Sequence, residues 1–365
     1  MVGEITKYFN YAKKQVFQRK ELNFLILYVT ANCNFQCRTC FFHASLNQGN
    51  DLSLAEFEKI SKNLGIFSLL LIGGGEPFLR ADLKEIVGFF ARNNKIDTLY
   101  IPTNGFLTEK ILSTVEALLE AWPDLTISIN PSLDGLGEYH DKLRGVPSAF
   151  ANAIKTIEGL VALKNNHKNL QVIVNSVFHK ENIGELKKLA VFLRQFNLDY
   201  HAFEVLRGDA RDKTLAPADL AEIKEMHDFI LVNRRWYFKK QIGRNLIFSF
   251  INKLVTLGHL AYTQYLKELV LAGKKWPMEC VAGQTIAVVY PSGDVGQCEL
   301  LGVTGNIRDY DYDLKKLLSA SAAASQRVSL KNNRCHCTHI CFINASLARD
   351  FKTVFKLPYF YLKNK

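Results

Sequence analysis

The sequence predicts an α/β protein, a partial (β/α)6 TIM-like barrel followed by a small C-terminal extension rich in cysteine. Six apolar runs alternate with segments of helical spacing over residues 22–206. Glycine-rich or polar motifs follow several of these runs, and five of the eight cysteines lie beyond residue 276. Repeated strand–helix units imply parallel strands joined by right-handed crossovers. Periodicity does not count barrel closure, so a doubly wound open sheet is the alternative. Either fold places ligands at the carboxyl ends of the strands.

The elements follow from apolar periodicity, taken in chain order. Strands are expected at 23–30, 68–72, 97–102, 124–130, 170–177 and 199–205. Helices are expected near 53–64, 82–93, 107–121, 148–164 and 182–196. Ser53 and Glu56 form a capping-box pattern at the start of the first of these helices. A further helix is expected at 217–233, and 286–290 followed by Pro291-Ser292-Gly293 predicts a β-hairpin.

These elements divide the chain into five expected segments. They are an N-terminal amphipathic helix at 1–21, a partial barrel at 22–206, a helical insert at 207–275, the cysteine-rich extension at 276–345 and a basic aromatic tail at 346–365. The insert and both terminal segments combine aromatic with basic residues. That composition suits either packing on the barrel or contact with a membrane surface.

Composition limits the location and the partners. Of the 365 residues, 48% are hydrophobic and 22% are charged, as in ordinary globular proteins. The first ten residues carry no apolar signal-peptide core, so we expect a cytoplasmic protein with membrane association at most. The net charge of +11 favours an anionic membrane or an acidic substrate, unless the lysines are merely solvated. No motif for nucleic acid is present, and none is expected as a partner.

Three cysteines at the end of the first strand point to metal chemistry. Cys33, Cys37 and Cys40 follow a C-x3-C-x2-C spacing, with Phe41 next in the chain. Thiolates at this density select zinc or an iron–sulfur cluster. Zinc normally takes a fourth protein ligand. Three thiols in one loop instead suit a cubane with one iron left open, and a structural zinc knuckle is the alternative.

Further motifs end the next three strands. Gly74, Gly75 and Glu76 belong to a GGGEP run, and glycine lets backbone approach a ligand closely. Asn104 belongs to a TNG turn after the third strand. After the fourth strand come Ser132 and Asp134 in an SLDG run and then Arg144, whose guanidinium suits a carboxylate. A surface salt bridge is the alternative for Arg144, and Asn175 on the fifth strand is a further cavity candidate.

Together, the cysteine triad and these runs resemble the radical S-adenosylmethionine (SAM) superfamily. The resemblance implies that Cys33, Cys37 and Cys40 hold a [4Fe–4S] cluster whose open iron binds SAM. It also implies that Phe41, Gly74, Gly75, Glu76, Asn104, Ser132, Asp134 and Arg144 line the cofactor site. The implied reaction is reductive cleavage of SAM to a 5′-deoxyadenosyl radical, which abstracts hydrogen from a substrate.

The later cysteines resemble the SPASM/twitch extension of such enzymes, which holds auxiliary clusters. They are Cys280, Cys298, Cys335, Cys337 and Cys341. Five cysteines fit one auxiliary [4Fe–4S] cluster, which needs four ligands. We favour Cys280, Cys298, Cys337 and Cys341, with Cys335 as the substitute for Cys337. The neighbouring His336 and His339 leave zinc open at this site.

Three functions are therefore weighed. The leading one is a radical SAM oxidoreductase or transferase acting on a lipid or other membrane-associated small molecule. The second is a SPASM-type maturase of ribosomal peptides, and the third is a non-catalytic iron–sulfur or zinc scaffold. A radical SAM enzyme also implies an electron donor such as flavodoxin or ferredoxin. The motifs after Cys40 would have no purpose in a scaffold, which disfavours the third.

Overall fold

The computed structural model describes residues 21–240 and 246–364, so the expected N-terminal helix at 1–21 lies almost wholly outside the described residues. The described chain is built around one nine-stranded sheet with the order β6-β5-β4-β3-β2-β1-β7-β8-β9. Its strands are β1 Phe24–Thr30, β2 Leu69–Gly74, β3 Thr98–Thr103, β4 Thr126–Pro131, β5 Leu170–Phe178, β6 Tyr200–Val205, β7 Ile286–Val289, β8 Asp294–Gly296 and β9 Val303–Asn306.

The first six strands confirm the predicted fold class. Each pairs in parallel with the next in sequence, from β1 with β2 through to β5 with β6. Each observed strand overlaps its predicted run. In the described residues β6 and β9 are the two edges of the sheet. The fold is therefore an incomplete barrel of parallel strands, and all their carboxyl ends meet at one edge.

Five of the six α-helices that the structure describes between β1 and β6 follow the prediction. The six helices are α2 Leu54–Asn63, α3 Leu83–Asn94, α4 Thr108–Ala121, α5 Gly137–Arg144, α6 Ala149–Leu163 and α7 Ile183–Phe192. The predicted capping box is present, because the Ser53 backbone N–H donates to Glu56 Oε2 at 2.8 Å. The short helix α5 was not predicted. Short 3-10 helices occupy His43–Ser45, Pro77–Leu79, Leu193–Gln195 and Ile307–Tyr310.

Strand β1 is buried on both faces and separates two apolar clusters. Leu25 and Leu27 belong to the main core, which the helices α2, α3, α4 and α6 cover. Alternate residues such as Ile26 and Tyr28 face a second cluster on the other side of the sheet. That second cluster contains the cysteines of the C-terminal extension. The first cysteine loop thus follows the carboxyl end of β1, and the later cysteines pack on one face of the same strand.

The predicted hairpin at 286–290 is present, and it continues the barrel sheet. Strand β7 pairs in parallel with β1, with Phe24 opposite Ile286, and β8 pairs antiparallel with β7. The four residues of β7 are all buried, as a strand next to the fully buried β1 requires. The division into five segments stays a prediction, but sheet and core run unbroken from the barrel into the extension.

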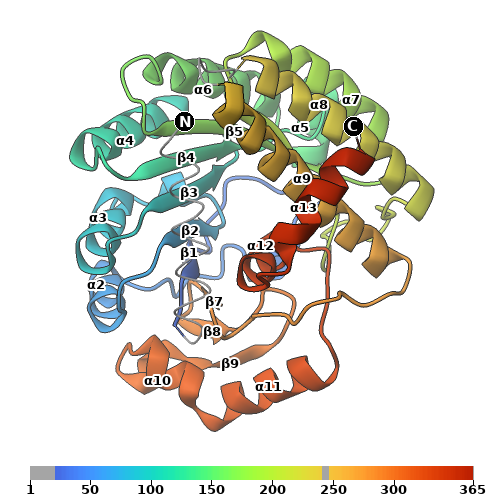
Figure 1. The fold of residues 1–365 in the computed structure, drawn as a ribbon. Helices are drawn as coiled ribbons and strands as arrows, with labels where there is room; N and C mark the ends of the chain where they lie inside the picture. The colour runs from blue at the N-terminus through green and yellow to red at the C-terminus, as the bar shows by residue number, and fades with distance from the viewer. Residues whose placement is uncertain (1–20, 241–245, 365) are drawn as a thin grey trace.

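The remaining helices are α8 Leu220–Lys240, α9 Leu246–Leu271, α10 Leu314–Ser319, α11 Ser321–Asn332, α12 Ile340–Arg349 and α13 Thr353–Lys363. Figure 1 shows α9, α12 and α13 gathered on the side of the strands opposite α2 and α3. Helix α13 packs along α9, where the rings of Tyr262 and Phe360 lie 4.7 Å apart. None of the described helices combines the length and the apolar character needed to cross a bilayer.

Candidate active site

The loop after β1 carries the first three cysteines and is fixed mainly through its backbone. The Cys33 N–H donates to Asn47 Oδ1 at 2.9 Å, and the Cys40 N–H donates to the Cys37 carbonyl at 3.2 Å. The Arg211 N–H donates to the Cys40 carbonyl at 3.0 Å. The backbone of the loop is therefore held by hydrogen bonds that do not involve the three thiols. All three thiols are half-buried and reduced.

Burial shapes the acidity of these thiols. It raises the pKa of Cys33 to about 12, and it also raises the pKa of Cys40. A buried thiolate is unfavourable without a neighbouring positive charge. Iron supplies that charge and deprotonates its thiol ligands. Thiols in this setting therefore suit a bound metal cluster better than a free reactive thiolate.

The glycine run after β2 lies against the start of the cysteine loop. The Gly75 N–H donates to the Thr30 carbonyl, and the Glu76 N–H donates to the Asn32 carbonyl, both at 2.8 Å. A Cβ at Gly75 would lie 2.1 Å from the Asn32 oxygen, and Gly74 has a φ of +114°. Only glycine fits such a close approach. The run therefore joins the GGEP segment directly to the cysteine loop.

Glu76 ties this segment to the third strand. Its side chain is 2% exposed and accepts hydrogen bonds from the Thr103 hydroxyl at 2.9 Å and the Asn104 N–H at 2.7 Å. Burial raises its pKa to about 7 against these stabilising bonds. The Asn104 amide donates to Asn34 Oδ1, within the cysteine loop, at 2.7 Å. Three strand ends thus meet in one hydrogen-bonded group.

A buried ion pair reaches the same loop from the fourth strand. Arg144 Nη2 lies 2.8 Å from Asp134 Oδ2, and Asp134 is fully buried. Arg144 Nη1 lies 3.7 Å from Cys37 Sγ. The pKa of Arg144 stays high although it is buried, because Asp134 and Cys37 offset the loss of solvent. The alternative of a surface salt bridge for Arg144 is therefore wrong, because its pair with Asp134 is buried and its guanidinium also contacts a cysteine of the triad.

The other predicted residues lie around this centre. Ser132 forms a bridge with Asn175 on β5, and its N–H donates to the Thr103 carbonyl at 2.9 Å. The guanidinium of Arg207 lies over the ring of Phe41, and Arg207 Cζ is 5.3 Å from the centroid of that ring. The structure thus brings the residues of every predicted motif to the carboxyl edge of the sheet. Which of them touch a cofactor stays a prediction.

The donor set fits an iron–sulfur cluster and SAM. It offers three thiols on one loop, a guanidinium against one sulfur, and backbone that glycine leaves open. Among the described residues, no three His, Cys, Asp or Glu side chains gather as the ligands of one metal ion do. The thiolates that hold a cubane lie farther apart than the ligands of a single metal ion, because each thiolate binds a separate iron.

The five later cysteines gather around one apolar cluster. All of them pack against the cluster that contains Phe24, Ile26 and Phe342. The thiols of Cys280 and Cys335 share a hydrogen bond, which lowers the pKa of Cys335 to about 6. Cys335 therefore lies inside the group, although the sequence favoured the other four. The choice of ligands stays a prediction.

A buried polar network that the sequence analysis missed connects the two cysteine sets. Tyr28, near the carboxyl end of β1, donates a hydrogen bond to Glu299, which directly follows Cys298. Glu299 also bonds to His339 Nε2, on the chain between Cys337 and Cys341. Burial alone would raise the pKa of Glu299, but His339, Arg207 and Tyr28 together hold it at about 2.

Arg207 and Lys267 bring positive charge to the same network. Arg207 Nη2 is 4.0 Å from Glu299 Oε2, and Lys267 Nζ is 3.0 Å from Glu204 Oε2. The Lys267 side chain is 5% exposed. Charged groups this deeply buried are costly, so they mark a functional-site candidate. Two features of the sequence could have indicated this network. Glu299 directly follows a cysteine, and Arg207 follows the sixth predicted strand.

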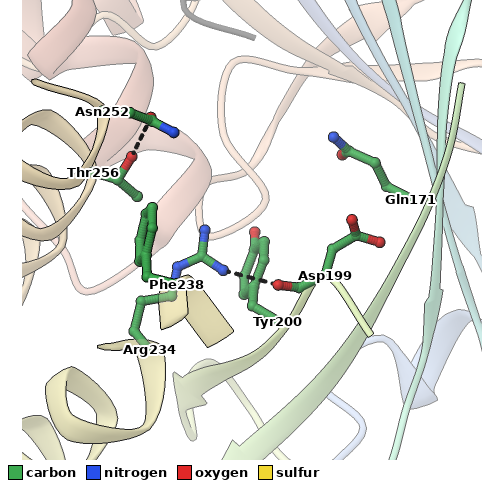
Figure 2. Close-up of a pocket in the computed structure, with 7 residues that line it drawn as sticks. All are labelled: Gln171, Asp199, Tyr200, Arg234, Phe238, Asn252 and Thr256. Carbon is green, nitrogen blue, oxygen red and sulfur yellow. Dashed lines mark hydrogen bonds between the residues drawn. The ribbon is translucent and has the colours of Figure 1, made fainter. Parts of the chain in front are cut away.

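Figure 2 shows a hollow whose lining includes none of the site residues described above. It lies where β5 and β6 begin, beside α8 and α9, with Arg234 stacked 3.8 Å from the ring centroid of Tyr200. Its lining residues are Gln171, Asp199, Tyr200, Arg234, Phe238, Asn252 and Thr256. Since ligands of parallel sheets bind at the carboxyl ends, this hollow is not the candidate active site.

Comparison with known proteins agrees with this geometry. Residues 27–193 match the family described as the Radical SAM superfamily. The chain is 25% identical over 230 residues to Fe-coproporphyrin III synthase of Methanosarcina barkeri, covering 61% of this chain and 54% of that protein. It is 25% identical over 308 residues to AdoMet-dependent heme synthase of the same organism, covering 78% and 79%.

A solved structure shows the same fold. Streptococcus suis SuiB, in its complex with the precursor peptide SuiA, aligns with a TM-score of 0.58 at 17% identity, covering 89% of this chain and 71% of that chain. The chain spans about half the length of the first curated relatives that it matches. The predicted family resemblance and the partial barrel are thereby confirmed.

Proposed function

From the premise that residues 27–193 of this chain are a radical SAM domain, we propose that the protein cleaves SAM reductively and abstracts hydrogen from an organic substrate. The proposal rests on one observation, which is that the sequence motifs contact one another at the carboxyl edge of the sheet. The thiol loop after β1 is bonded to the ends of β2 and β3, and Cys37 contacts Arg144. A scaffold protein would need the thiols but not these partners.

The proposal gives each group a role. Cys33, Cys37 and Cys40 would hold the cluster, which when bound supplies the electron for SAM cleavage. Gly75 and Glu76 would present backbone and a buried carboxylate to the cofactor. Arg144, fixed by Asp134, places a permanent positive charge beside the Cys37 sulfur.

We propose that the substrate binds at the carboxyl edge of the sheet, near the polar network that lies beside the C-terminal cysteines. Tyr28, Arg207, Glu299 and His339 form a buried polar group there, next to the auxiliary cysteines. Buried hydrogen-bonding groups of both signs suit a substrate with a polar or charged end. On its apolar side Tyr28 is flanked by Phe42 and Tyr290, whose ring centroids lie 4.9 Å and 5.5 Å from its own. This combination supports an amphiphilic small molecule, such as a lipid or another membrane-associated compound.

A peptide substrate is the second candidate, since the solved SuiB complex contains a precursor peptide. Both candidates imply an external electron donor such as flavodoxin or ferredoxin, because the chain must be reduced before each turnover. A cytoplasmic location belongs to the same proposal.

Release of 5′-deoxyadenosine tests the proposal. Anaerobically reconstituted protein, given dithionite and SAM, should release it even without substrate. Cys40→Ala should abolish the release, whereas Cys298→Ala, outside the SAM site, should retain it. The proposal fails if the reconstituted parent releases none, or if Cys40→Ala matches the parent.

The same assay separates the substrate candidates. A lipid extract or a peptide pool that contains the substrate should raise SAM consumption above the uncoupled rate. Mass spectrometry should then find a product in that pool. With Cys298→Ala we expect uncoupled cleavage without product.

A further inference from the structure

Helix α13 is apolar on two opposite faces, and only one of them is covered. Leu357, Phe360 and Tyr361 are buried against α9, where the Leu357 carbonyl lies so close to Gly258 that a Cβ there would clash. A helix that is apolar all round is normally buried on all sides or lies in a membrane. The second face of α13 is not buried within the described chain.

The uncovered face carries several exposed apolar side chains. We call it the α13 outer face. It consists of Phe351, Val354, Phe355, Tyr359 and Leu362, which are between 56% and 79% exposed. The spacing of the four residues from Val354 to Leu362 places them on one stripe of the helix, and Phe351 lies just before its first turn. Phe250 of α9 is also 55% exposed, and its ring packs edge-on against the buried Tyr361 of α13 with 6.2 Å between the ring centroids.

The charged residues around the α13 outer face indicate which kind of partner covers it. Lys352 and Lys363 are exposed at its two ends, and residues 351–364 contain no aspartate or glutamate. Lys356 is half-buried and lies 3.9 Å from Asp350. Aromatic rings flanked by lysines, without acidic residues, are typical of helices that lie in the interface of an anionic bilayer. The net charge of +11 adds attraction to such a surface.

A second copy of the chain fits this face less well. Most homodimers are two-fold symmetric, so the same patch meets itself. That arrangement would bring Lys352 and Lys363 of both copies together. Residues 351–364 hold no carboxylate to compensate them. A membrane surface of negative charge meets no such conflict.

We propose that the α13 outer face docks the protein on the surface of a bilayer that contains anionic lipid. The buried side of α13 belongs to the same apolar cluster as Cys280 and Cys337. Docking through α13 therefore places the C-terminal cysteines close to the lipid surface. The inference concerns binding alone, so it stands or falls independently of the SAM chemistry.

Vesicle co-sedimentation of the full chain, kept anaerobic, tests this. The probes are phosphatidylcholine vesicles with and without about a quarter phosphatidylglycerol. The parent should bind the anionic vesicles at low salt, bind weakly at high salt and bind the neutral vesicles less. Phe355→Ser with Tyr359→Ser should lower the vesicle partition coefficient at least about tenfold. Lys352→Glu with Lys363→Glu should remove the preference for anionic lipid.

A matched control is available. Val191→Ser with Val328→Ser removes apolar side chains that are 57% and 59% exposed on other helices, and it should bind like the parent. The proposal is overturned if the parent ignores anionic vesicles, or if the α13 variant binds as well as this control. It is also overturned if ultracentrifugation finds a lipid-free dimer that the α13 variant dissociates.

Discussion

Arg144 and Asp134 form a buried ion pair, with 2.8 Å between Nη2 and Oδ2, at the carboxyl edge of the sheet. Asp134 also accepts a hydrogen bond from the Val177 N–H at 2.8 Å. The pair therefore links α5 to β5 and directs the Nη1 nitrogen of Arg144 toward Cys37. Removing one partner leaves a buried charge, whereas removing both leaves none.

We first predict that Arg144→Ala lowers the free energy of unfolding by about 3 kcal/mol, because Asp134 keeps its buried charge. Asp134→Asn combined with Arg144→Ala should recover more than half of this loss, since both charges are then absent. SAM cleavage should be lost in both variants because Arg144 is missing. Urea unfolding and 5′-deoxyadenosine release measure the two effects. Equal stability of the single and double variants would show that the pair is not coupled.

The second prediction concerns pH. Burial raises the pKa of Glu76 from 4.5 to about 7. The folded chain thus binds this proton more tightly than the unfolded chain does. The contribution of Glu76 to stability is complete below about pH 4.5 and is lost as the pH rises through 7. Over that range the parent should lose roughly 3 kcal/mol more than Glu76→Gln does. Urea unfolding of both proteins between pH 5 and 8 checks this, and parallel profiles would refute it.

The sequence located the barrel strands well because their apolar runs are continuous. Strands in a parallel sheet are covered on both faces, and Leu25, Ile26 and Leu27 of β1 are each no more than 1% exposed. The turn motifs also mark strand ends directly, since Gly75 and Glu76 follow β2. Local chemistry was therefore enough to place the cysteine loop and the cofactor motifs on one edge.

Long-range pairings could not be predicted. Tyr28 and Glu299 are 271 positions apart, and the local sequence around either residue does not indicate that the two are in contact. The pairing of β7 with β1 was hidden for the same reason, because four buried residues can extend any sheet. Helix α5 was missed because its eight residues bury only His140 and Leu143, too few for a clear helical period.

The third prediction uses metal content. The reconstituted parent should contain roughly eight irons per chain, as two cubanes require. Cys40→Ala and Cys298→Ala should each contain about four, because each removes one ligand of a different cluster. Iron and sulfide assays measure this directly. A parent with about four irons and one zinc would instead assign the C-terminal cysteines to zinc.

The fourth prediction tests the contact between the GGEP segment and the cysteine loop. Gly75→Ala would place a Cβ 2.1 Å from the Asn32 carbonyl oxygen, which is backbone and cannot rotate away. The two segments must then separate, so the variant should lose SAM cleavage and several degrees of thermal stability. Gly184→Ala is the matched control, because nothing lies within 4 Å of its Cβ position in α7. In a helix that substitution should be neutral or stabilising by up to about 1 kcal/mol. If Gly75→Ala has the same melting temperature and the same rate of SAM cleavage as Gly184→Ala, the close approach of the two segments is not needed for activity.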